Sequence, residues 1–156
     1  MARTATSRAG NDRRPAGFTL LELLIVLAIL GLTAGMAVPM FAQAMPDIQA
    51  RAAARDVAAM MRAARSLAIT GNREVAVAVD LDRRTVDLAG ERSEAIAKGI
   101  ALDLYTAEEE LIGRRAGRIR FYPDGTSTGG RVRLSTATRT YDVRVDWISG
   151  GVTVND

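Results

Sequence analysis

The most informative part of the sequence is Arg13-Arg14-Pro15-Ala16-Gly17-Phe18-Thr19-Leu20-Leu21-Glu22, and an apolar run follows it as far as Ala44. Between Phe18 and Met45 the only ionisable side chain is that of Glu22. A charge inside an apolar helix is costly in lipid unless a partner pairs with it. The stretch therefore predicts a membrane-length helix that carries one carboxylate in need of a partner.

The length of the apolar run fits a transmembrane helix, which we expect over residues 18–45. About 20 mostly apolar residues are needed to span a bilayer. Residues 1–17 carry four arginines and one aspartate, so the positive-inside rule keeps this leader in the cytoplasm. We expect the residues after the helix to lie on the far side of the membrane.

The same residues resemble the processing signal of type IV prepilins and type II secretion pseudopilins. The matching residues are Gly17, then Phe-Thr-Leu-Leu-Glu at 18–22, then Leu-Leu-Ile-Val-Leu-Ala-Ile-Leu at 23–30. The resemblance implies that a prepilin peptidase removes the leader 1–17 by cutting between Gly17 and Phe18, and that the amine of Phe18 is then N-methylated. It also implies a single-pass protein of the bacterial inner membrane whose head lies in the periplasm.

Glu22 is the residue for which we expect an assembly role. Cleavage would leave a positive amine at Phe18, and the Glu22 carboxylate of a neighbouring subunit could neutralise it. Charge-assisted hydrogen bonds are the stronger ones, more so where water is scarce. The hypothesis is that Glu22 sets the register of like helices in a bundle, and that its loss impairs assembly without preventing membrane insertion.

Two simpler interpretations of the apolar run compete with this one. A secretory signal peptide could be cleaved after Ala42-Gln43-Ala44, but its apolar region usually spans only about 7–15 residues. A glutamate near the start of the run also argues against it. A plain single-pass anchor would place the helix correctly but would leave Gly17, Phe18 and Glu22 unexplained.

The composition of the 156-residue chain excludes several kinds of chemistry. It contains no cysteine and no histidine, which removes thiol redox chemistry, histidine acid–base catalysis and the common zinc sites. The run Glu108-Glu109-Glu110 predicts a solvated loop or helical turn and not a metal site. We therefore expect no enzymatic activity, no metal and no cofactor.

Charge is distributed unevenly along the chain after the leader. Residues 74–110 carry ten acidic and four basic side chains, whereas residues 111–156 carry eight arginines and four aspartates. The two halves could pair with each other inside the fold, or they could contact other subunits. The sequence leaves both interpretations open.

Residues 46–72 predict an amphipathic helix that leaves the membrane. Apolar side chains recur there at steps of three and four, namely Val57, Met60, Met61, Ala64, Leu67 and Ala68. The arginines lie away from this stripe, at Arg51, Arg55, Arg62 and Arg65. Pro39 and Pro46 predict an interruption of the helix, and Gly71-Asn72 predicts its end. We expect the stripe to pack against a sheet.

Residues 73–156 predict a β-rich head, beginning with Val75, Val77 and Val79, which alternate with other residues in the period of a strand. Further strands are expected at 85–88, 100–105, 117–122, 131–135, 140–147 and 152–154, with turns at 82–84, 123–125 and 149–151. The predicted fold class is α+β. A long N-terminal helix packs on a mostly antiparallel β head, as the resemblance to pilins implies.

The head is similar to the GspH/FimT family, which contains the H-type minor pseudopilins of type II secretion and the FimT-type minor pilins. The similarity lies in DVAAMMRAARSLAITGNREVAVAV at 56–79 and in IRFYPDGTSTGG at 119–130. The second segment matches the pattern F-x-P-D-G-x-S-x-G-G. We interpret it as structural, because Asp124-Gly125 suits a tight turn and because no helix start follows the glycines, as a phosphate loop would need.

The resemblance implies a structural role. The protein would be a minor pseudopilin at or near the tip of the type II secretion pseudopilus, would contact major and minor pseudopilins, and would support protein export across the outer membrane. Its other partners would be the prepilin peptidase and the inner membrane.

The alternative is a FimT-like minor type IV pilin that binds DNA for uptake. Two G-R-x-R segments place Arg118 with Arg120, and Arg131 with Arg133, on one face of a strand each. Such pairs could contact phosphate. FimT-like DNA binders carry their basic motif near the C-terminus, and residues 150–156 contain no basic residue. Nucleic acid is therefore the less favoured partner.

Overall fold

The computed structural model describes residues 18–88 and 90–156, and of residues 35–44 it describes the backbone alone. The predicted leader 1–17, with Gly17 of the predicted cleavage site, lies outside the described residues, as do the side chains of 35–44 in the predicted span 18–45. The chain divides into two compact units, Met1–Met40 and Phe41–Asp156.

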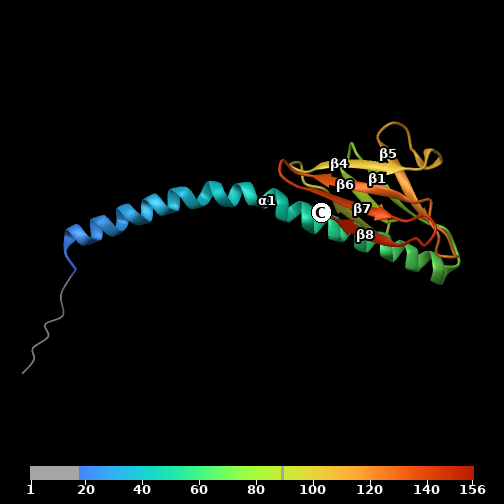
Figure 1. The fold of residues 1–156 in the computed structure, drawn as a ribbon, viewed down its shortest axis with the longest axis horizontal. Helices are drawn as coiled ribbons and strands as arrows, with labels where there is room; N and C mark the ends of the chain where they lie inside the picture. Colours follow the sequence, from blue (N-terminus) through green and yellow to red (C-terminus); the bar gives the residue numbers. More distant parts are fainter. Residues whose placement is uncertain (1–17, 89) are drawn as a thin grey trace, which may run out of the picture. The chain divides into compact units, whose positions relative to one another are not determined.

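The described residues form one α-helix, eight strands and one short 3₁₀ helix (Figure 1). In chain order these are α1 (Leu20–Gly71), β1 (Val75–Asp80), β2 (Thr85–Leu88), β3 (Arg92–Ala95), β4 (Ala101–Thr106), η1 (Glu108–Glu110), β5 (Ala116–Phe121), β6 (Gly130–Ser135), β7 (Thr140–Val145) and β8 (Val152–Asn155). The interruption predicted at Pro39 and Pro46 is wrong, since α1 continues through both positions to Gly71.

In the first unit α1 exposes a long apolar surface. Its side chains that are more than half exposed are Leu20, Leu21, Leu23, Leu24, Ile25, Leu27, Ile29, Leu30 and Leu32. A contiguous apolar surface of this kind marks a site of contact with lipid or with another protein. Within the part of the chain that the structure describes, no helix combines the length and the hydropathy needed to cross a bilayer.

In the second unit the predicted stripe of α1 forms the centre of the core. Five of its six side chains are buried, namely Val57, Met60, Met61, Ala64 and Ala68, and Leu67 is partly buried. The arginines that flank the stripe reach the surface, with Arg65 half-buried. The helix ends at Gly71 as predicted, where Asn72 takes the left-handed φ of 45° that stops a helix.

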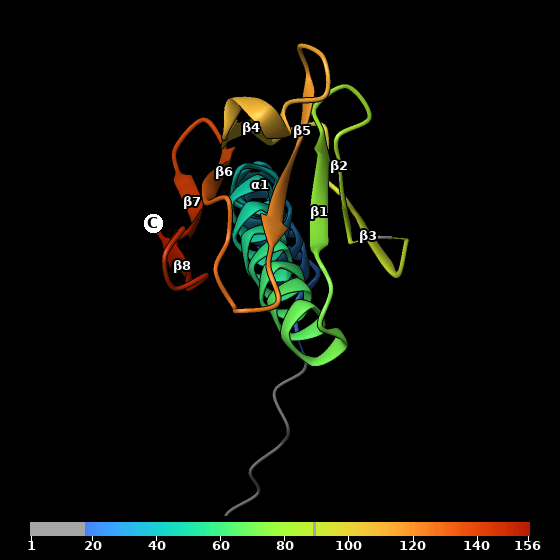
Figure 2. The ribbon, with the colours of Figure 1, turned by 90° about the vertical axis from the view of Figure 1, so that its right-hand side faces the viewer.

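The strands form two antiparallel four-stranded sheets, in the orders β3-β2-β1-β5 and β4-β6-β7-β8. Figure 2 shows the first sheet on one side of α1, while β6, β7 and β8 lie on its other side. In the first sheet alternate residues of β1 and β5 are buried, as in β5, where Gly117, Ile119 and Phe121 are buried. The predicted α+β class with an antiparallel β head on the helix is confirmed.

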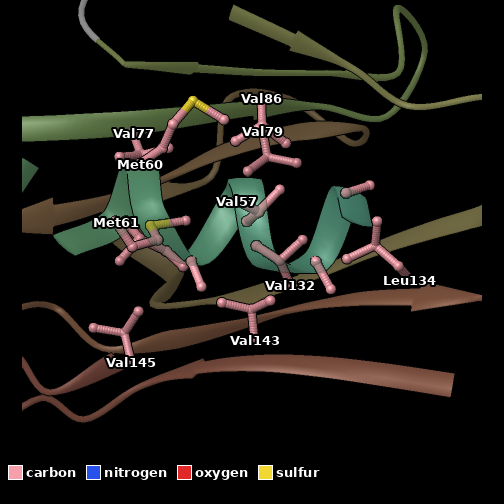
Figure 3. Close-up of a cluster of buried hydrophobic side chains, with 14 of the residues drawn as sticks. Val57, Met60, Met61, Val77, Val79, Val86, Val132, Leu134, Val143 and Val145 are labelled. Atoms are coloured by element: carbon pink, nitrogen blue, oxygen red, sulfur yellow. The ribbon is translucent and has the colours of Figure 1, made fainter. Parts of the chain in front are cut away.

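One core joins the helix to both sheets, because the two sheets bury their inner faces against opposite sides of α1. Figure 3 shows Met60, Met61 and Val57 of the helix between valines of the two sheets. The sheet residues of this cluster are Val77, Val79, Val86, Val132, Leu134, Val143 and Val145, all buried. The C-terminal part of α1 is thus an integral element of the head.

Two strand predictions differ from the structure. The strand β3 was not predicted, because three of its four side chains are exposed and show no alternation. The strand expected over 140–147 ends at Val145, and Trp147 lies in the following turn with 66% of its surface exposed. Hydrophobic alternation in the sequence therefore could not reveal the strand β3 or the end of β7.

Candidate assembly site and arginine faces

The start of α1 carries the predicted assembly residue. The carbonyl of Thr19 accepts the first helical hydrogen bond, from the amide of Leu23 at 3.2 Å. The hydroxyl of Thr19 accepts a hydrogen bond from the amide of Glu22, also at 3.2 Å. Thr19 is therefore the N-cap and Glu22 the third helical residue, and the pair makes one half of a capping box, the hydrogen bond from the third amide to the N-cap hydroxyl. The sequence signal for this cap, Thr-x-x-Glu, was present but was not used in the prediction.

Glu22 is exposed in the first unit and takes part in no ion pair within the described residues. Its negative charge is favourable at the positive end of the helix dipole. Phe18 lies four residues earlier in the chain, with 77% of its surface exposed. The geometry thus presents a carboxylate at the entrance of an apolar helix surface, where a cation from another molecule can reach it.

The first predicted arginine pair lies on the outer face of β5 and is engaged with carboxylates. Arg120 donates to both oxygens of Glu110, at 2.6 and 3.3 Å, and to Glu74 at 2.8 Å. The hydrogen bond to Glu110 raises the pKa of Arg120 above its usual value. Arg118 lies 3.3 Å from the same Glu110 carboxylate. Here the acidic and basic halves of the chain pair inside the fold.

Glu110 is buried, whereas the sequence predicted that the run 108–110 would be solvated. The run 108–110 forms the helical turn η1 as predicted, but Glu110 is only 4% exposed and not solvated. A buried carboxylate needs partners, and Arg118 with Arg120 supplies them from two residues on one strand face. Among the described residues no three acidic, histidine or cysteine side chains lie where they could hold a metal ion.

The second predicted arginine pair lies on the outer face of β6. Arg133 donates to both oxygens of Asp142, at 2.8 and 3.2 Å. Arg131 and Arg144 approach the same carboxylate at 3.7 and 3.6 Å. The hydrogen bond from Arg133, aided by the charges of all three arginines, lowers the pKa of Asp142. Three guanidinium groups thus share one carboxylate.

An aromatic ring completes this outer face. The guanidinium of Arg131 lies 4.2 Å from the centre of the Tyr105 ring, and that of Arg133 lies 5.8 Å from it. Both distances suit a cation–π contact. Arg131 is therefore held between a ring and a carboxylate, whereas Arg144 remains 55% exposed.

The segment 121–130 is the crossover from the first sheet to the second. Its turn is held by Asp124, whose Oδ1 accepts the amide and the hydroxyl of Thr126 at 2.9 and 2.7 Å. These hydrogen bonds lower the pKa of Asp124. The Ser127 hydroxyl donates to the carbonyl of Arg120 at 2.7 Å and accepts the amide of Gly129 at 3.1 Å. The polar groups of the segment bind one another or the backbone of the adjacent Arg120, which agrees with the structural interpretation.

Family models match both parts of the chain. The model of the type II transport protein GspH matches residues 53–151. The model of the prokaryotic N-terminal methylation motif matches residues 12–38. Type II secretion system protein H of Xanthomonas campestris pv. campestris is 28% identical over 140 residues, which is 90% of this chain and 83% of that protein.

Two solved structures share the fold. The minor pseudopilin EpsH from the type 2 secretion system of Vibrio cholerae aligns with a TM-score of 0.54 and 14% identity, covering 69% of this chain and 96% of that one. The type IV minor pilin FimU of Pseudomonas aeruginosa aligns with a TM-score of 0.53 and 13% identity, covering 68% of this chain and 87% of that one. At these identities the likeness concerns the fold alone.

The sequence signal, the helix with its two sheets and the family models point the same way. The GspH model extends over more than half of the chain and includes the core helix from residue 53 onward, the strands β1 to β7 and the segment 121–130. The chain belongs to the GspH family of type II transport proteins, and within it the chain is a minor pseudopilin of type II secretion.

Proposed function

We propose that this protein is a non-enzymatic building block at or near the tip of a periplasmic pseudopilus, where it supports protein export across the outer membrane. The observation that carries the proposal is the pairing of a GspH-family head with a helix whose apolar side chains are exposed from Leu20 to Leu32. Such a surface is stable in lipid before assembly and against other helices after it. Its partners are major and minor pseudopilins, contacted through helix and head.

Processing prepares the chain for assembly. A prepilin peptidase cuts between Gly17 and Phe18 and removes the leader 1–17, and the new amine of Phe18 is N-methylated. Residues 18–45 then anchor the chain in the inner membrane, with the head in the periplasm. The methylation-motif match over 12–38 and the four arginines of the leader support this proposal.

Glu22 pairs with the amine of a neighbouring subunit's first residue. The cap supports this role, because the Thr19 hydroxyl satisfies the Glu22 amide and leaves the carboxylate free for a partner. In an apolar bundle the pair is worth more than at a wet surface, since water no longer competes for either charge. The register of the helices then follows from the position of one carboxylate.

The test uses a bacterium deleted for this gene and complemented with the full chain or with Glu22→Ala or Glu22→Asp. We expect the unaltered chain to restore secretion of type II cargo and to cross-link to other pseudopilins. Glu22→Ala should still be processed and reach the membrane fraction but should lose cross-linking and secretion, and Glu22→Asp should recover part of both. Full secretion and unchanged cross-linking with Glu22→Ala would contradict the assembly role.

DNA capture is the second candidate function, favoured by one observation: four arginines lie on the outer faces of β5 and β6. All four are engaged with Glu74, Glu110 or Asp142, which weakens the candidate. A salt-dependent shift of duplex DNA by the full chain in detergent, lost in Arg131→Gln and Arg133→Gln, would support it. Absence of binding at low salt would end it, because phosphate contacts are strongest there.

A further inference from the structure

A surface hollow beside the β7–β8 turn is not explained by the family role. We name this hollow the β7 pocket, and it has a volume of ≈ 550 Å³. Its lining includes Tyr105, Arg131, Arg144, Asp146, Trp147 and Thr153. Strand register creates it, since Tyr105 pairs with Arg131, Arg131 with Arg144, and Arg144 with Thr153 across all four strands of the second sheet. Side chains at paired positions share a face of the sheet.

The pocket has an apolar wall that water covers in the free protein. Trp147 is 66% exposed, Tyr105 is 48% exposed, and Ile148 next to the pocket is 62% exposed. Burying such side chains against a partner is favourable in proportion to the apolar area removed from water. Tryptophan, tyrosine and arginine are also the residues that most often dominate binding energy at protein interfaces.

The backbone under Trp147 is held in place before any partner arrives. Asp146 Oδ1 accepts the amide and the hydroxyl of Ser149 at 2.8 and 2.7 Å, and these bonds lower the pKa of Asp146. The amide of Gly150 donates to the Asp146 carbonyl at 2.9 Å, and the Trp147 carbonyl accepts the amide of Ser127 at 3.0 Å. A fixed anchor loses little conformational entropy on binding.

The pocket also contains a cation, Arg144, whose guanidinium is still partly exposed to solvent. Asp142 is shared by Arg131, Arg133 and Arg144, and its two short hydrogen bonds both come from Arg133. Arg144 stays 55% exposed at 3.6 Å from that carboxylate, and the buried Nε of Arg131 has no hydrogen-bond partner among the described residues. An added carboxylate would therefore relieve repulsion between cations and gain a charge-assisted hydrogen bond from Arg144.

We propose that the β7 pocket docks a peptide segment of a partner protein in which a carboxylate stands next to a bulky apolar side chain. Arg144 binds the carboxylate, and Trp147 with Tyr105 covers the apolar side chain. Nucleic acid fits less well, because tracking a phosphate backbone needs several unopposed cations, whereas Asp146 lines the pocket and Asp142 is shared by all three arginines beside it. This inference goes beyond the pseudopilin role. If peptide binding is disproved, the pseudopilin role still stands.

Trp147 is the only tryptophan of the chain, so its fluorescence reports on the pocket directly. The full chain in detergent micelles is titrated with a blocked pentapeptide that contains glutamate next to leucine. Two matched peptides serve as controls: one carries glutamine in place of the glutamate, and the other carries glycine in place of the leucine. We expect saturable binding with a blue-shifted emission for the first peptide and at least about tenfold weaker binding for the other two, which is the effect of about 1.4 kcal/mol.

Variants separate the pocket from the rest of the surface. Arg144→Gln should weaken the glutamate–leucine peptide at least about tenfold, whereas Arg114→Gln, an exposed arginine outside the pocket, should leave binding unchanged. Calorimetry with Trp147→Ala should show the same loss as Arg144→Gln. The proposal is overturned by absence of peptide binding at millimolar concentration, by tighter binding of single-stranded DNA, or by a concentration-dependent self-association that Arg144→Gln abolishes.

Discussion

The backbones of Gly125 and Gly150 meet at the end of the head, so close that a Cβ on Gly150 would lie 2.2 Å from the Gly125 carbonyl oxygen. The same oxygen accepts a hydrogen bond from Nε of Arg65 on α1, at 3.1 Å. Two turns that are 25 residues apart in sequence thus lie against each other, and one of them is hydrogen-bonded to an arginine of the core helix. Both glycines have positive φ, 84° and 61°, which favours glycine at each position.

We predict that Gly150→Ala destabilises the head by at least about 2 kcal/mol, because a left-handed alanine alone costs roughly 1–2 kcal/mol and the clash adds to it. Gly99→Ala is the matched control, since a Cβ there meets nothing within 4 Å and the backbone needs no positive φ. Urea unfolding followed by circular dichroism gives both values. Equal stability of the two variants would show that the turns can separate without loss.

Neutralising the buried carboxylate should also weaken the head. Glu110→Gln removes the charge that Arg118 and Arg120 share, and we expect the free energy of unfolding to fall by about 1–3 kcal/mol. The loss stays within this range because both guanidinium groups keep part of their contact with water. Glu109→Gln changes the exposed neighbour in the same turn and should shift stability by no more than about 0.5 kcal/mol. The same unfolding measurement compares the two. A larger loss of stability from Glu109→Gln than from Glu110→Gln would contradict the structural role of Glu110.

The stability of the head should depend on pH through Asp142. Its pKa is lowered in the folded protein, first by the hydrogen bond from Arg133, so the folded state favours the ionised form. The stabilisation is complete above the unfolded-state pKa of about 3.9 and is lost as the pH falls through the lower folded value. Asp142→Asn should therefore be less stable than the unaltered chain at pH 6 and should lose less stability between pH 5 and pH 2.

The control for this titration is Asp103→Asn, an exposed aspartate on strand β4 of the same sheet. Its stability curve should keep the slope of the unaltered chain between pH 5 and pH 2. A slope that persists unchanged in Asp142→Asn would mean that the other carboxylates account for the acid sensitivity of the head.

Periodicity in the sequence was enough to predict the core helix and the first strand, because both have one buried face. Val57, Met60 and Met61 recur at helical spacing and Val75 with Val77 at strand spacing, and all are buried. The strand order could not be predicted, because alternation states that a strand has an inner face but not which neighbour it pairs with. The division into two sheets on either side of one helix therefore emerged only in three dimensions.

Signals that are local in sequence were easier to detect than sites that depend on tertiary contacts. The signal around Phe18 and Glu22 is contiguous in sequence, and the methylation-motif model matches the same stretch, whereas the roles of the two residues stay predictions. The burial of Glu110 depends on two arginines of another element, and a run of three glutamates alone predicts solvent exposure. Trp147 was placed in a strand because its apolar neighbours resemble one, whereas its exposure follows from the turn that Asp146 holds.

The cap at the start of α1 leads to the last prediction. Thr19 accepts the Leu23 amide with its carbonyl and the Glu22 amide with its hydroxyl. Thr19→Val keeps the first bond and removes the second, which should loosen the first turn by about 1 kcal/mol. Hydrogen exchange of the Glu22 amide in detergent micelles should accelerate by roughly fivefold, since 1.4 kcal/mol corresponds to a factor of ten.

Thr33→Val is the control, because the Thr33 hydroxyl only donates to the carbonyls of Ile29 and Leu30, both at 3.0 Å, and holds no helix end. If Glu22 must reach a neighbour's amine from a fixed helix start, Thr19→Val should also reduce cross-linking between subunits, although less than Glu22→Ala, because the charge is still present but less well placed. Faster exchange with unchanged cross-linking would show that the carboxylate finds its partner without a formed first turn, and the register would then be set by the apolar side chains that follow.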